Sequence, residues 1–156
     1  MKAITIIQPW ATLIALGEKR FETRSWATRH RGEIAIHAGK KLDKRICQQE
    51  PFRSVLAKHG YTENNLPTGA IIAIGNLQSC YVISRPYGDE ESVWLEGDGK
   101  LVEWDRVNRT AQERLEYIFG DYRDGRYAWE MTDVQRLEEP VPVKGMQGLW
   151  NWKDVK

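Results

Sequence analysis

The segment from Gly17 to Trp26 reads GEKRFETRSW. Its residues 20–25 alternate between charged and less polar side chains, and this is the period of a β-strand, because successive side chains point to opposite faces. Three charged residues share one face of the predicted strand: Arg20, Glu22 and Arg24. Phe21 falls on the opposite face, so the pattern predicts a strand that buries Phe21 and presents a charged face to a cleft.

The same segment begins a basic run that continues to residue 31. Between residues 19 and 31, five basic residues stand against Glu22 alone: Lys19, Arg20, Arg24, Arg29 and Arg31. Trp26 and His30 are interleaved with them, and Ser25 precedes Trp26. Guanidinium groups bind phosphate in a bidentate manner and aromatic rings stack on bases, so the run is typical of a groove for single-stranded nucleic acid. The alternative is a solvated basic strand whose aromatic residues face the core.

Lys19 stands in the turn that precedes this strand. Glu22 and Arg24 are two residues apart, so they lie on one face and can pair there. A lysine held near such a pair can bind phosphate, or act as a base or nucleophile if desolvation lowers its pKa. The residues alone leave both roles open.

Further elements follow from hydrophobic periodicity and from turn residues. Strands are predicted at Ala3–Ile7, Glu33–Ala38, Gly69–Ile83, Tyr127–Met131 and Val134–Leu137. Helices are predicted at Pro9–Gly17, Asp43–Gly60 and Thr110–Gly120. Pro51 must kink or split the second helix, because proline removes a backbone donor from the helix interior. The third helix opens with a capping box, and its predicted apolar stripe is Ala111, Leu115, Ile118 and Phe119.

These elements predict an α+β protein built on a curved or closed mixed sheet, a β-barrel, with flanking helices. The 156 residues, 18.1 kDa and 41% of apolar residues fit a single domain that spans 1–156. Residues 84–105 are acidic and rich in turn residues, so we expect an acidic excursion there, a solvated loop on the surface.

The chain lacks the sequence motifs of several classes of cofactor-binding and metal-binding proteins. The chain has no G-x-G-x-x-G and no G-x-x-x-x-G-K-[ST] motif, and its three histidines lack the spacing of a zinc site. We therefore expect neither a metal nor a cofactor. Cys47 and Cys80 form no C-x-x-C pair and are expected to be free buried thiols in a reducing compartment. No apolar run reaches the length of a membrane span, so a cytoplasmic protein with no membrane partner is expected.

The formal net charge of +1 conceals an asymmetry along the chain. Residues 1–60 carry 12 Lys and Arg against 5 Asp and Glu, whereas residues 61–156 carry 11 against 17. A basic side of this size would attract polyanions. If the two halves interleave in the fold, however, the charges mix and no such side exists.

The motif of the opening segment resembles that of the ASCH domain, a family of the PUA-like superfamily named for its homology to activating signal cointegrator. The family hallmark G-x-K-x-x-E-x-R is met by Gly17, Lys19, Glu22 and Arg24. Further blocks resemble the cointegrator-like branch of the family: Gln8-Pro9-Trp10-Ala11, Arg24-Ser25-Trp26, His30-Arg31-Gly32 and Pro142-Val143-Lys144-Gly145. The resemblance is dense from Ile4 to about Lys41, thin in the middle, and returns near the end.

The resemblance implies a PUA-like β-barrel flanked by helices, with the motif residues in a cleft that takes RNA, single-stranded nucleic acid or a modified nucleoside. It also implies two enzymatic alternatives. Small relatives remove an acyl group from a modified cytidine with the motif lysine and a threonine, and ribonuclease activity is associated with the family. This chain has Glu22 in place of that threonine, so the acyl-removing mechanism does not carry over intact.

Together, the residues and the resemblance favour a nucleic-acid binding module. The expected binding residues are Lys19, Glu22, Arg24, Ser25, Trp26, His30 and Arg31. The alternative is a small hydrolase, a nucleoside amidohydrolase or a ribonuclease, in which Lys19 and Glu22 are the catalytic pair. A third interpretation, with no chemistry of its own, is an adaptor that binds a protein partner through residues 140–152 or the acidic excursion.

Overall fold

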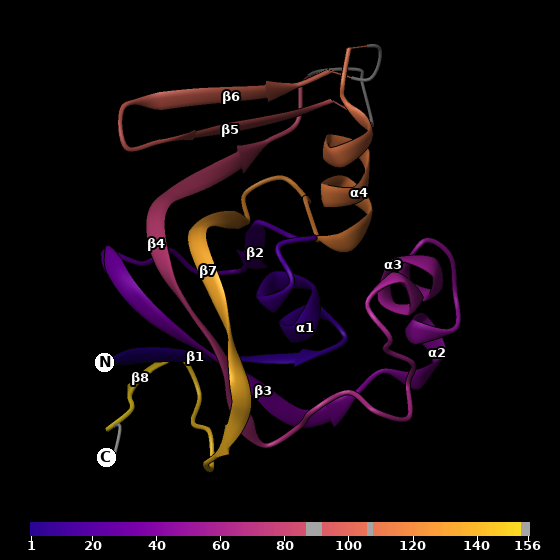
Figure 1. Cartoon of the computed structure of the whole chain (residues 1–156). Helices are drawn as coiled ribbons and strands as arrows, with labels where there is room; N and C mark the ends of the chain where they lie inside the picture. The colour runs from indigo at the N-terminus through magenta and orange to yellow at the C-terminus, as the bar shows by residue number, and fades with distance from the viewer. Residues whose placement is uncertain (87–91, 106–107, 154–156) are drawn as a thin grey trace. The chain divides into compact units, whose positions relative to one another are not determined.

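A computed structural model of the chain describes residues 1–86, 92–105 and 108–153 (Figure 1). The chain divides into two compact units. The first contains residues 1–19, 33–76 and 133–156, and the second contains residues 20–32 and 77–132. Two long strands, β4 (Ala70–Ser84) and β7 (Tyr127–Pro142), contribute residues to both units.

The first unit holds a mixed sheet in the strand order β7-β4-β3-β1-β8. Its other strands are β1 (Lys2–Gln8), β3 (Gly32–Leu42) and β8 (Leu149–Asn151). Strand β1 is parallel to β3, with Ile4 opposite Ile36, and antiparallel to β8. Residues 34–38 of β3 are all buried, as expected of a strand that is covered on both faces.

The helices of the first unit are α1 (Trp10–Ala15), α2 (Lys44–Cys47) and α3 (Phe52–Lys58). Asp43 caps α2, because its side chain accepts a hydrogen bond from the backbone N–H of Ile46 at 3.0 Å. The helix expected at residues 43–60 is thus two short helices, and Pro51 stands at the start of the second. The expected split at this proline is confirmed.

The second unit has the strand order β2-β7-β4-β5-β6. Strand β2 (Phe21–Arg24) is antiparallel to β7, with Glu22 opposite Trp129. The unit also contains β5 (Val93–Gly97), β6 (Lys100–Trp104) and the helix α4 (Ala111–Phe119). Its core is largely aromatic: Phe21, Tyr81, Trp104 and Tyr122 pack with Ile83, Val93, Leu95 and Ala128. The predicted burial of Phe21 is confirmed, since 2% of its surface is exposed.

The predicted α+β class, with a mixed sheet and flanking helices, is confirmed. Within each unit the described strands form an open row. No described helix is long and apolar enough to cross a membrane.

The acidic excursion at 84–105 is not the solvated loop that was predicted. Its described part contains a hairpin, β5–β6, in which β5 alternates between buried and exposed residues and β6 buries Trp104. The reversal falls at Asp98 and Gly99, whose φ angles of 51° and 72° are those of the type I′ turn that suits a two-residue hairpin. Leu95 and Val93 are fully buried, and this apolar face overrides the acidic composition. Residues 87–91 of the predicted excursion lie outside the described residues.

The predicted apolar stripe of α4 is also wrong in part. Phe119 is buried as expected, but Ile118 is 49% exposed and Ala111 is exposed. The residue that the helix buries completely is Glu116, at 0% exposure. A hydrogen bond outweighs hydrophobicity here, because the Glu116 carboxylate accepts the backbone N–H of Arg20. The predicted capping box is present, formed by Thr110 and Glu113.

Candidate functional site

Lys19 lies in the first unit, at the end of the turn that follows α1. Gly17 adopts a φ of 77°, a left-handed conformation that ends the helix and that glycine adopts without strain. The backbone N–H of Lys19 then donates to the carbonyl of Leu13 at 3.0 Å. Lys19 itself is 1% exposed. The sequence thus placed Lys19 correctly in the turn before β2, but its nearly complete burial was not predicted.

Glu22 and Arg24 form an ion pair on β2, in the second unit. The Nε of Arg24 donates to Oε2 of Glu22 at 3.0 Å. The Glu22 side chain is 9% exposed and that of Arg24 is 25% exposed, so Glu22 is the more shielded partner of the pair. The pairing predicted from their spacing is confirmed.

Trp26 follows the end of β2 and is half-buried. Its ring meets the ring of Trp129 edge to face, with the ring centroids 4.7 Å apart and an interplanar angle of 88°. The indole Nε1 of Trp129 also donates to the backbone carbonyl of Trp26 at 3.3 Å. Trp129 therefore holds both the ring and the backbone of Trp26 in place.

The strand register explains why these groups meet. In the antiparallel pair of β2 and β7, Glu22 lies opposite Trp129 and Arg24 lies opposite Tyr127, and residues directly opposite each other share a face. The Glu22–Arg24 pair and the Trp129 ring that holds Trp26 therefore belong to one face. The sequence predicted only a strand at Tyr127–Met131, and the role of Trp129 in fixing Trp26 was missed.

Ser25, His30 and Arg31 lie in the irregular segment after β2. Ser25 is exposed, and half-buried His30 donates its backbone N–H to Oγ1 of Thr28 at 3.1 Å. Arg31 forms a bidentate pair with Asp98, with both N···O distances at 2.9 Å. This hydrogen-bonded pair raises the pKa of Arg31 and lowers that of Asp98. No sequence pattern pointed to Asp98 as a partner, because it is 67 positions away from Arg31.

The structure places most of the seven predicted binding residues in one unit. Six of the seven residues belong to the second unit: Glu22, Arg24, Ser25, Trp26, His30 and Arg31. Lys19 belongs to the first unit. The face formed by β2 and β7 combines a guanidinium, a carboxylate and a held aromatic ring. It can bind phosphate, accept hydrogen bonds from a base edge and offer a stacking surface.

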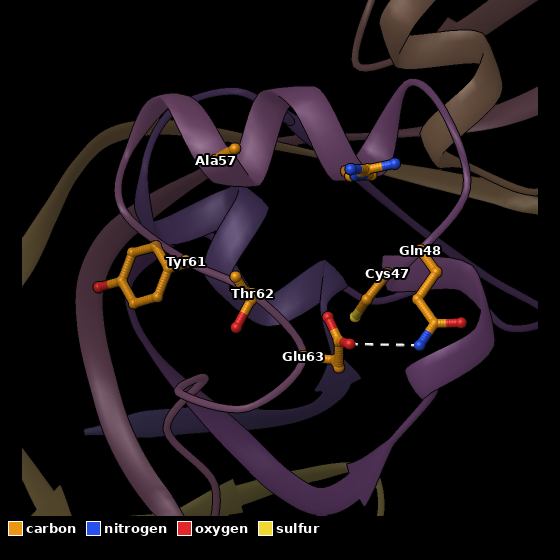
Figure 2. A pocket seen from close by; sticks show the side chains of 7 residues that line it. Cys47, Gln48, Ala57, Tyr61, Thr62 and Glu63 are labelled. Atoms are coloured by element: carbon orange, nitrogen blue, oxygen red, sulfur yellow. Dashed lines mark hydrogen bonds between the residues drawn. The ribbon is translucent and has the colours of Figure 1, made fainter.

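A pocket of about 570 Å³ in the first unit lies between α2, α3 and the residues that follow α3 (Figure 2). It is lined by Cys47, Gln48, Arg53, Ala57, Tyr61, Thr62 and Glu63. Gln48 donates to the Glu63 carboxylate at 3.2 Å across one side of it. None of the seven predicted site residues lines this pocket.

The two cysteines are free and buried, as predicted. Burial, aided by the carboxylates of Glu63 and Asp43, raises the pKa of the Cys47 thiol to about 11. Burial also raises the pKa of Cys80. Within the part of the chain that the structure describes, no group of three or more His, Cys, Asp and Glu side chains is arranged to hold a metal ion.

Comparison with known proteins assigns the chain to a family. A family model described as the ASCH domain matches residues 4–141. The chain belongs to the ASCH family. The resemblance that was seen in the G-x-K-x-x-E-x-R motif is confirmed, and the match extends through the middle of the chain, where the motif blocks are thin.

Two curated relatives of this ASCH chain, one from Homo sapiens and one from Mus musculus, are both named Activating signal cointegrator 1. Each is 35% identical to the ASCH chain over 80 residues, which is 49% of this chain and 14% of the relative. The matched region thus spans about one seventh of the length of these relatives.

Two solved structures from Zymomonas mobilis are similar to this ASCH chain. The first is the ASCH protein of that organism, with 16% sequence identity and a TM-score of 0.44. The second is a mutant of the Zymomonas protein, with 15% sequence identity and a TM-score of 0.45. Both matches cover 90% of this chain. They cover 72% of the Zymomonas ASCH chain and 74% of the mutant chain. The α+β fold class of the ASCH chain rests on its own strands and helices.

Proposed function

We propose that this ASCH domain binds RNA, or another single-stranded or modified nucleotide, through the motif segment, defined as residues 17–31. The observation that carries the proposal is the shared face of β2 and β7. There the Glu22–Arg24 pair lies on the same face as Trp129, which holds the Trp26 ring edge to face. Proteins that bind single-stranded nucleic acid combine charged groups with aromatic rings in this way.

Each group has a role in this proposal. Arg24, whose side chain is 25% exposed, binds phosphate, while Glu22 accepts hydrogen bonds from the amino edge of a base. Trp26 stacks on a base, and the contact with Trp129 reduces the ordering cost of binding. Lys19, Ser25, His30 and Arg31 complete the proposed set.

The test is a fluorescence-anisotropy titration of a labelled 12-nucleotide RNA with the wild-type chain and with Arg24→Ala and Trp26→Ala. We expect each variant to bind about tenfold more weakly, because one stacked base or one charged hydrogen bond is worth about 1–3 kcal/mol. Arg24→Ala should also flatten the slope of log K against log[salt] by roughly 0.7, the value for one phosphate contact on a single strand.

Arg114→Ala is the matched control, because Arg114 is an exposed arginine on α4 of the same unit and carries the same charge. Trp26→Phe should retain most of the affinity, since the ring face is kept. If Arg24→Ala and Trp26→Ala both bind like Arg114→Ala, the proposal is wrong. A parallel titration with DNA of the same sequence separates RNA binding from general single-strand binding.

A second candidate is the hydrolysis of a modified nucleoside or of RNA with Lys19 and Glu22 as the catalytic pair. Its specific support is burial, since Lys19 is 1% exposed and Glu22 is 7% exposed. Desolvation is one condition under which a lysine becomes a nucleophile or base. Product must then accumulate beyond the protein concentration, and Lys19→Ala must abolish turnover while the protein still unfolds cooperatively. The free buried thiols favour a reducing compartment such as the cytoplasm for either function.

A further inference from the structure

Arg31 is held by a dense set of hydrogen bonds at the end of the motif segment. Its Nε and Nη2 both donate to the carboxylate of Asp98, at 2.9 Å each. Its Nη1 donates to the backbone carbonyls of Thr28 at 2.9 Å and His30 at 2.8 Å. The two carbonyls fix the orientation of the guanidinium plane, and Asp98 occupies the edge formed by Nε and Nη2.

That edge is one of the two guanidinium edges that bind phosphate in a bidentate manner. A carboxylate and a phosphate offer the guanidinium the same pair of oxygens, so they compete for one bidentate site. The Arg31 and Asp98 side chains are 34% and 33% exposed, so solvent and solutes reach the pair. If Asp98 moved away, the carbonyls of Thr28 and His30 would still hold Arg31 ready for an incoming anion.

The hairpin β5–β6 delivers Asp98 to this position. Asp98 is the first central residue of the type I′ turn, at a φ of 51°, a conformation that aspartate and asparagine tolerate better than most residues. Its Oδ2 also accepts the backbone N–H of Cys80, a weak bond of 3.4 Å. The bidentate bond from Arg31 keeps the pKa of Asp98 below its usual range, so the carboxylate is charged at neutral pH.

We propose that Asp98 takes the place of a ligand phosphate on Arg31, so that the hairpin turn competes with nucleic acid for the anion site of the motif segment. This inference rests on the proposed function and adds a regulating residue to it. Binding of a phosphate to Arg31 then requires the carboxylate to leave. The apparent affinity is lowered by the fraction of molecules in which Asp98 occupies the site.

The first experiment compares the wild-type chain with Asp98→Asn in the RNA titration. Asparagine keeps the shape, the turn conformation and an oxygen acceptor, but it removes the charge. Asp98→Asn should bind RNA about three- to tenfold more tightly, because the competing state is weakened. Its salt slope should be steeper by roughly 0.7, as expected for one additional phosphate contact on a single strand.

Glu96→Gln is the matched control, since Glu96 is exposed on the same hairpin and its change alters the net charge equally. Arg31→Ala should weaken binding, and Asp98→Asn should no longer help in the Arg31→Ala background, because the two residues then act through one contact. Tightening by Glu96→Gln to the same extent would mean a general charge effect and would overturn the proposal.

The competing explanation is that Asp98 only clamps the hairpin to the motif segment. Under that explanation, Asp98→Asn weakens RNA binding or leaves it unchanged, and either result contradicts the proposal. Asp98→Gly, which also suits a type I′ turn, is a second variant in case Asp98→Asn unfolds.

A second readout is independent of RNA. The NMR resonance of the Arg31 Nε–H is followed while inorganic phosphate is added to the wild type and to Asp98→Asn. The variant should respond at severalfold lower phosphate concentration, and equal responses would overturn the proposal. If this shift appears while no RNA binds to any form of the chain, the proposed function fails and the anion site stands. If RNA binding depends on Arg24 but not on Asp98, only the present inference fails.

Discussion

Cys47 lies in the pocket of Figure 2, and its environment makes a clear prediction about thiol reactivity. Its pKa of about 11, raised chiefly by burial from the ordinary 9.0, leaves roughly a hundredfold less thiolate at pH 8 than an unperturbed thiol has. Because the thiolate is the reactive form, alkylation of Cys47 by iodoacetamide should be slow at pH 8 and rise about tenfold per pH unit toward 11.

Peptide mapping by mass spectrometry distinguishes Cys47 from Cys80 in that measurement. Both cysteines should be labelled at the rate of a free thiol once the chain is unfolded in urea. Rapid labelling of Cys47 at pH 8 in the folded protein would mean that the thiol is neither as buried nor as protonated as its surroundings imply.

The residue types of the candidate site could be predicted from the sequence, but several partners could not. The ion pair of Glu22 and Arg24 follows from strand spacing alone, because the two residues are neighbours on one strand face. The role of Trp129 depends on the register of two strands that are over 100 positions apart, and Asp98 reaches Arg31 through the turn of a distant hairpin. Contacts of this kind depend on tertiary structure and leave no local pattern.

At the level of the helix, α4 shows how one hydrogen bond changes which face is buried. Glu116 is completely buried, and its carboxylate accepts the backbone N–H of Arg20, directly before β2. Replacement by leucine keeps an apolar helix face but leaves that partly buried donor without this acceptor. Glu116→Leu should therefore lower the free energy of unfolding by about 1–3 kcal/mol, even though hydrophobicity increases.

Glu116→Gln is the companion variant, because its amide oxygen can still accept the bond from Arg20. It should cost clearly less than Glu116→Leu in urea unfolding followed by tryptophan fluorescence. A leucine variant as stable as the wild type would show that burial of the helix face, and not the hydrogen bond, holds α4 in place.

Among the strands, those with strong alternation were predicted and the hairpin was missed. The β2 pattern is confirmed within one residue, whereas β5 and β6 were hidden by the acidic composition of residues 84–105. The local signal was present, since Asp98-Gly99 between alternating residues is a strong indication of a hairpin. The average composition of residues 84–105 conceals such a two-residue signal. Many side chains of the hairpin point to solvent, and their acidic character dominates that average.

For the whole molecule, the charge asymmetry of the sequence is redistributed by the fold. Residues 20–32 from the basic half belong to the second unit together with residues 77–132. The former carry four Arg against one Glu, and the latter carry 7 Lys and Arg against 12 Asp and Glu. The halves of the chain therefore interleave, as the alternative interpretation held. Residues 20–32, which are basic, therefore share their unit with an acidic majority, and the Arg31–Asp98 pair is one direct contact between the two groups.

The connectivity of the chain bears on the prediction of a single domain. The backbone passes between the two units four times, and neither unit is a continuous stretch of sequence. Strands β4 and β7 each supply residues to both units without interruption. Unfolding of either unit must therefore release the ends of strands that the other unit needs. We expect one cooperative unfolding transition for residues 1–156.

Differential scanning calorimetry tests this expectation. The calorimetric enthalpy should equal the van't Hoff enthalpy, and the tryptophan fluorescence and far-UV circular dichroism transitions should share one midpoint. Glu116→Leu, which perturbs the second unit alone, should lower that midpoint as a whole, because a single cooperative structure transmits the loss to every probe. If the variant instead splits the thermogram into an early and an unchanged late transition, the units unfold separately and the single-domain prediction is wrong.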